Sequence, residues 1–121
     1  MEGQLVKLNI SDLTVENTIY RNVIATYAHH QIVLMSVSRC IPLEIHPETD
    51  QFFRVEKGHI RVITFSPNGE EYYIDVFDDE TVSIPAGTYH QVINMNPDGP
   101  TKLYTIYSPP HHPPGLQEDE N

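Results

Sequence analysis

Short runs rich in Ile, Val, Tyr and Phe recur along most of the chain, and polar turn residues separate them. Runs of this length and composition are typical of β-strands. Many short strands at near-regular spacing, with no long helical pattern, predict a closed β-barrel or a sandwich. We expect strands at residues 19–27, 31–38, 51–55, 59–65, 71–77, 81–84, 89–94 and 102–107.

Turn residues divide the chain into three parts. The sequence Ser-Pro-Asn-Gly at 66–69 predicts a hairpin between the strands at 59–65 and 71–77. We expect residues 1–18 to form a lead-in, in which Ser11 and Asp12 cap one short helical turn. Residues 108–121 contain four prolines and an acidic end. Because proline cannot donate to a sheet ladder, we expect this part to be an extended tail with mobile last residues. It carries the pair His111-His112 and could fold back across the barrel, but its proline content favours packing outside the domain or on a second subunit. The expected organisation is a lead-in at 1–18, one barrel at 19–107 and a tail at 108–121.

Composition narrows the possible partners. A chain of 121 residues, 39% hydrophobic and 20% charged, suits one folded domain. The formal net charge of −10, without any cluster of Lys or Arg, argues against nucleic acid and anionic membranes as partners. No apolar run approaches the roughly 20 residues that span a bilayer. Cys40 is the single cysteine, so no internal disulfide can form and we expect a reducing, cytoplasmic location.

Four polar residues are candidates for a metal site. Glu44 and His46 are two residues apart on an expected strand, so their side chains should share one face. A turn-prone stretch follows, and a hairpin-like reversal there can bring Gln51 back beside His46, while His90 follows a second turn further along. Taken singly, each would more often be an ordinary solvated residue. Together, two imidazoles, a carboxylate and a carboxamide oxygen suit one divalent ion, zinc first, with Mn, Fe, Ni and Co as alternatives.

Two motifs resemble those of the cupin superfamily. Residues 85–94, PAGTYHQVIN, read P-x-G-x-x-H-x-x-x-N, and Glu44-x-His46 with Gln51 and Gly58 resembles the first cupin motif. The resemblance covers about residues 20–110 and implies an all-β, jelly-roll-type cupin barrel with Glu44, His46, Gln51 and His90 as metal ligands at one barrel mouth. Glu44 stands where cupins most often have the first histidine of the motif, and Gln51 stands where they most often have glutamate. The ligand set therefore still contains one carboxylate, at a different position in the motif.

One subgroup of the superfamily resembles this chain more closely than the others do. Residues 46–58, HPETDQFFRVEKG, and 102–115, KLYTIYSPPHHPPG, resemble small single-domain cupins described as mannose-6-phosphate-isomerase-like. The resemblance implies a metalloenzyme acting on a small oxygen-rich metabolite, either a sugar isomerase or epimerase or a dioxygenase. The alternative is a non-catalytic metal-dependent module that binds or senses a small ligand.

The sequence offers few candidates for a catalytic acid or base. Tyr104 and Tyr107 should lie on opposite faces of the last strand, so one of them can reach the cavity. His30 lies in a loop that would have to cover the barrel mouth to take part. We also expect a homodimer, because apolar residues such as Tyr89 and Ile93 fall on the outer face of the barrel.

Overall fold

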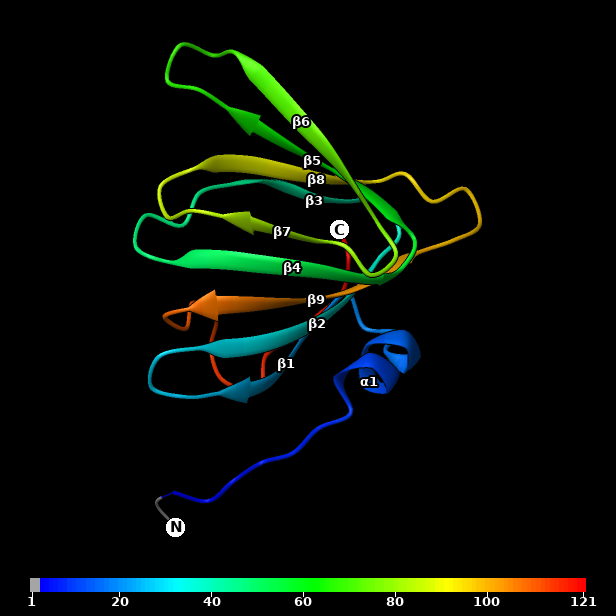
Figure 1. Ribbon diagram of the computed structural model, residues 1–121, viewed down its shortest axis with the longest axis vertical. Coiled ribbons are helices and arrows are strands. Elements are labelled where there is room, and N and C mark those ends of the chain that lie inside the picture. Colours follow the sequence, from blue (N-terminus) through cyan, green and yellow to red (C-terminus); the bar gives the residue numbers. More distant parts are fainter. Residues whose placement is uncertain (1–2) are drawn as a thin grey trace.

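The computed structural model describes residues 3–121 and shows two antiparallel sheets packed face to face (Figure 1). One sheet has the order β10-β1-β2-β9-β4-β7 and the other the order β3-β8-β5-β6. The predicted all-β, single-domain jelly roll is therefore confirmed. The first two residues of the expected lead-in lie outside the described part. The elements are α1 (Ile10–Glu16), β1 (Arg21–Thr26), β2 (Gln31–Val37), β3 (Cys40–Glu44), β4 (Asp50–Lys57), β5 (His59–Phe65), β6 (Glu71–Phe77), β7 (Thr81–Ile84), β8 (Tyr89–Asn94), β9 (Thr101–Ser108) and β10 (Gln117–Glu118).

The core fills the space between the two sheets, because alternate side chains of each strand point inward. Val33 and Phe53 from one sheet and Val62 and Val92 from the other are all at most 2% exposed. At one end of the sandwich this apolar filling gives way to a polar row. Gln31, Tyr107 and Gln51 are register partners across β2, β9 and β4, and all three are buried. Buried polar groups need partners, so this end is where a functional site is expected.

The helix begins earlier than the sequence suggested. Asn9, rather than Ser11 or Asp12, is the N-cap, and its side chain accepts a hydrogen bond from the backbone N–H of Asp12. The helix packs its buried Thr14 toward the sheet that contains β9 and β4. In the described part of the chain, no helix is long and apolar enough to cross a membrane.

Three motif residues serve the fold rather than the chemistry. Gly58 has φ of +130°, and a Cβ there would lie 2.9 Å from the Cα of Thr101, so this close approach requires glycine. Gly87 makes the turn before β8 with φ of +80°. Asn94 donates to the carbonyl oxygens of Ser38 and Gly99, which closes the loops at the end opposite the polar row.

The prediction that the tail packs only on the outside of the domain is wrong. Residues 109–120, called the strap below, return to the sandwich end that carries the polar row. The side-chain oxygen of Gln31 accepts hydrogen bonds from the backbone N–H groups of His111 and His112. Gln31 also donates to the His112 carbonyl at 2.7 Å. Satisfying a buried amide in this way fixes the strap across the barrel end.

The far end of the strap is fixed as well. Strand β10 pairs with β1, and Glu118 forms an ion pair of 2.7 Å with Arg21. Glu120 then accepts hydrogen bonds from the backbone N–H groups of residues 38 and 39, in the turn before β3, and of Cys40, the first residue of β3. Glu118 and Glu120 thus hold the end of the chain, because the carboxylate of each meets hydrogen-bond donors of the sandwich.

Candidate metal centre

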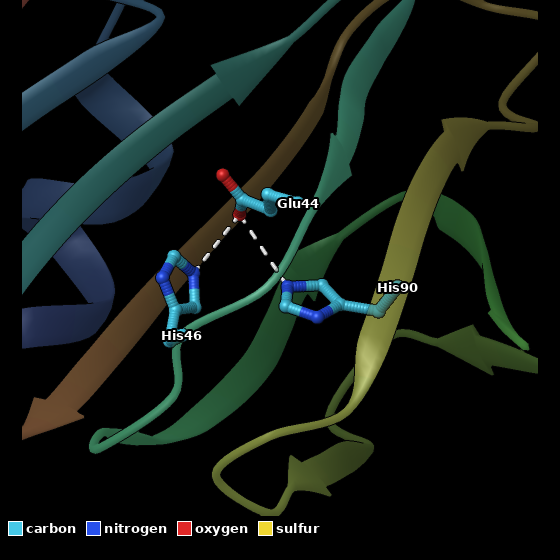
Figure 2. A group of neighbouring side chains, drawn as sticks. All are labelled: Glu44, His46 and His90. Atoms are coloured by element: carbon cyan, nitrogen blue, oxygen red, sulfur yellow. Dashed lines mark hydrogen bonds and ion pairs between the residues drawn. The ribbon is translucent and has the colours of Figure 1, made fainter. Parts of the chain in front are cut away.

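Three of the four candidate ligands meet inside the barrel, at the end with the polar row. Glu44 is the last residue of β3, and His90 is its register partner on β8. His46 lies after β3 rather than on it, so the expected strand through 44–46 is wrong. Its carbonyl accepts a hydrogen bond of 2.9 Å from the N–H of Gly87, which ties this turn to the turn that precedes His90. Figure 2 shows the three side chains pointing toward one another.

The distances among these groups match those around a bound metal ion. The Glu44 Oε1 atom lies 3.2 Å from His46 Nε2 and 3.4 Å from His90 Nε2 (Figure 2). Ligands at about 2.1 Å from an ion are about 3.0 Å apart at adjacent octahedral positions and about 3.4 Å apart at tetrahedral ones. Both distances are therefore those of ligands that share one ion. Among the described residues, Glu44, His46 and His90 form a group whose ligand atoms all lie within 4.8 Å of one another and that could hold a metal.

The tautomer of His90 strengthens this interpretation. Its Nδ1 atom lies 2.9 Å from the carbonyl oxygen of Thr88, which can only accept, so Nδ1 carries the proton. In the neutral ring, Nε2 then presents a lone pair to the Glu44 carboxylate. This Nε2 is buried and has no hydrogen-bond partner within residues 3–121. A cation between the two groups would resolve the repulsion, and a backbone carbonyl on the other ring nitrogen is a common feature of metal-binding histidines.

The Glu44 carboxylate stays ionised in this setting. Burial by itself would raise its pKa, but His46 and His90, when protonated, outweigh burial through their hydrogen bonds and charge and hold the pKa well below its usual range. A metal ion in place of those protons would act in the same direction. The site therefore supplies one negative charge, while both histidines are almost fully buried, at 4% and 1% exposure. A partly buried carboxylate flanked by two buried imidazoles is a suitable host for a divalent ion.

Gln51 reaches this region from the opposite sheet. It lies on β4, whereas Glu44 lies on β3 of the facing sheet, so the chain crosses between sheets and the expected hairpin-like reversal is wrong. Gln51 is 2% exposed, and its amide nitrogen donates to the Thr105 hydroxyl at 3.2 Å. Its oxygen, Oε1, is buried without a hydrogen-bond partner among the described residues. Such an orphaned acceptor is costly unless a cation or another donor meets it.

Of the proposed acid–base candidates, the structure brings Tyr107 to the centre and leaves the other two away from it. The Tyr107 ring lies 5.5 Å from that of His46, and its hydroxyl lies 3.2 Å from His112 Nε2. Burial raises the pKa of Tyr107 far above its usual range, so the hydroxyl keeps its proton. Tyr104 points outward and packs near Phe52. His30 is exposed in the β1–β2 turn, where it stacks on Tyr27.

A further residue, His111, closes the barrel mouth. Its ring lies 4.2 Å from the His46 ring and stacks against Tyr107 at 5.6 Å. The sequence marked the histidine pair in the tail but favoured packing on the outside, and the local pattern held no signal for the contact with His46. A pocket of about 370 Å³ opens here, lined by His46, Pro47, Glu48, Thr49, Pro109, Pro110 and His111.

Comparison with known proteins identifies the family to which this architecture corresponds. The cupin domain family matches residues 32–107. A crystal structure of BH2720 from Bacillus halodurans has a TM-score of 0.90 and 40% identity, over 98% of this chain and 91% of that one. The uncharacterized protein L612 of Acanthamoeba polyphaga mimivirus is 41% identical over 94% of this chain and 71% of its own length. The uncharacterized protein YrkC of Bacillus subtilis is 42% identical over 89% of this chain, which spans only 59% of that relative.

Proposed function

The chain belongs to the cupin family, and we propose that it holds one divalent metal ion and binds a small oxygen-rich metabolite on that ion. The observation that carries the proposal is the convergence of the Glu44, His46 and His90 ligand atoms, at 3.2 and 3.4 Å, in a buried site. When bound, the ion would supply Lewis-acid polarisation of an oxygen of the metabolite.

Gln51 completes the proposed ligand set. Its orphaned Oε1 gives a donor set of two nitrogens and two oxygens with a single negative charge, which suits zinc first and Mn, Fe, Ni or Co as alternatives. Four protein donors leave room on a six-coordinate ion for two oxygens of one ligand. A hydroxy-acid, a 2-oxo acid or the hydroxy-carbonyl end of a sugar has such a pair of oxygens.

The residues of the mouth support two versions of this function. In the first, the protein is a mononuclear metalloenzyme, an isomerase, epimerase or dioxygenase, in which Tyr107 donates a hydrogen bond and His111 contacts the metabolite. The second version is a non-catalytic binding or sensing module. It is supported by the engagement of the Tyr107 hydroxyl with His112, which leaves that hydroxyl less available for proton transfer.

Metal analysis and ligand titration test the proposal. The purified protein should contain up to one divalent ion per chain, and the cobalt-loaded form should change its visible spectrum on addition of glycolate, lactate or pyruvate. Exchange of the substrate's α-proton in deuterium oxide, or oxygen uptake, would identify the enzyme, and binding without either would identify the sensing module. Failure to take up a stoichiometric ion, or to bind any chelator when loaded, would contradict the proposal.

Gln51 should be the weakest of the four ligands. We expect Gln51→Ala to lower metal affinity about tenfold, because water can replace a neutral oxygen donor. Gln51→Glu, which keeps the shape and adds charge, should bind zinc at least as tightly as the natural protein. Competition with a chromophoric chelator measures both. If Gln51→Ala binds metal as tightly as the natural protein, the buried oxygen is not a ligand.

A further inference from the structure

A row of side chains leads away from the proposed metal ligands along the inner face of one sheet. Glu44 is the register partner of His90, His90 of Thr64, and Thr64 of Tyr72. Register partners in antiparallel strands project to the same face, and neighbouring strands are about 4.8 Å apart. Thr64 is therefore the immediate neighbour of His90 on the side away from Glu44, and Tyr72 is the next residue beyond it.

A pocket of about 240 Å³ begins at this row and lies between β6 and β7. These strands are the edges of the two sheets and diverge from the turn that joins them (Figure 1). The walls are mostly apolar, with Val62, Tyr72, Ile74, Val82 and Ile84 among the lining residues. Ile84 is the register partner of Gln51. The pocket, called the edge pocket below, thus adjoins His90 through Thr64 and Gln51 through Ile84.

Two apolar side chains of the edge pocket are exposed although they project toward the inside of the sandwich. Tyr72 and Ile74 share the inner face of β6 with Val76, which is 2% exposed, yet they are 59% and 54% exposed. Covering such surface with an apolar group is favourable by roughly 25 cal/mol per Å². The volume is below the roughly 300–1,000 Å³ typical of pockets for drug-sized ligands, so it suits a substituent of a few carbons.

We propose that the edge pocket binds the apolar substituent of the metabolite whose oxygens occupy the metal. This inference rests on the proposed function and narrows its substrate class to 2-hydroxy or 2-oxo acids that carry an aliphatic or aromatic side chain. The opening beside the strap is lined by His46, Glu48 and His111 and is more polar. The oxygen-rich head of the ligand would therefore lie at the metal, and its apolar part would point into the edge pocket between β6 and β7.

A series of ligands of increasing length tests the inference on the natural protein. Glycolate, 2-hydroxybutanoate and 2-hydroxyhexanoate are titrated into the cobalt-loaded protein, and the visible spectrum reports binding. We expect affinity to rise by up to about fourfold for each methylene that enters the pocket. Equal affinities along the series would overturn the edge pocket and leave the proposed function intact. Absence of binding by every acid would overturn the proposed function and the edge pocket with it.

A matched pair of variants on β6 locates the effect. Ile74→Ser removes an apolar wall of the pocket, whereas Phe77→Ser changes a side chain of similar exposure, 49%, on the outer face of the same strand. In Ile74→Ser, the gain from glycolate to 2-hydroxyhexanoate should shrink severalfold. In Phe77→Ser, the gain should match that of the natural protein. An equal loss of the gain in both variants, or in neither, would overturn the assignment to this pocket.

Discussion

Replacing His90 with alanine should lower the affinity for a divalent ion by more than about a hundredfold. This loss exceeds the roughly 10- to 100-fold range that follows the removal of a residue that only hydrogen-bonds to a metal ligand. The change removes the ligand that is most firmly held in place, because the Thr88 carbonyl fixes its tautomer and β8 fixes its backbone. His46→Ala should be comparable. Glu44→Ala should be nearly as severe, since it removes the single negative charge that the site provides.

The neighbouring residue provides the control for this prediction. Tyr89 precedes His90 on β8, points to the outer face and is 51% exposed, so Tyr89→Ala should keep the natural metal affinity. Chelator competition measures affinity, and circular dichroism checks that each variant is folded. Removing the metal from the natural protein should also lower its melting temperature, since an ion that binds the folded state stabilises it. If His90→Ala retains full metal occupancy, the centre described above is wrong.

Local patterns in the sequence were sufficient for most of the strands and for three converging ligands. The strands at 59–65, 71–77, 81–84 and 89–94 coincide with those observed, because alternation and turn residues act over only a few positions. Glu44 and His46 still meet although the strand ends at Glu44, because the turn keeps both side chains toward the barrel interior.

The features that the sequence did not predict depend on contacts between distant segments. A local pattern cannot show whether the turn after His46 returns to the same sheet or crosses to the other, and Gln51 lies on the other. The strap depends on Gln31, about 80 positions away, and on a turn at residues 38–40 that Glu120 reaches from the other end of the chain. The contact between His111 and His46 follows from those anchors, so no motif around His111 could have indicated it.

Deleting residues 117–121 should lower the free energy of unfolding by about 2–4 kcal/mol, between the ranges for an exposed ion pair and for breaking a buried one. The Arg21 side chain is only 11% exposed and would lose Glu118, its partner at 2.7 Å. Glu118 itself is 42% exposed, so that ion pair alone should contribute toward the lower end of the range. Loss of Glu120 adds to the cost, because three backbone N–H groups at residues 38–40 lose their acceptor.

Single substitutions within the strap separate these contributions. Glu118→Gln and Glu120→Gln should each be destabilising in urea unfolding, whereas Asp119→Asn, on the exposed residue between them, should stay within about 0.5 kcal/mol of the natural protein. A deletion that costs less than about 1 kcal/mol would show that neither carboxylate anchors the strap.

Because the same strap carries His111 onto His46 and His112 onto Tyr107, its release should also increase hydrogen exchange at the barrel mouth and speed the loss of bound metal to a chelator. The increase in hydrogen exchange and the faster metal loss should both grow with the loss of stability, from Glu118→Gln to the full deletion. Both should be absent in Asp119→Asn. This pattern would establish that the far end of the strap stabilises the metal centre by keeping the strap closed over it.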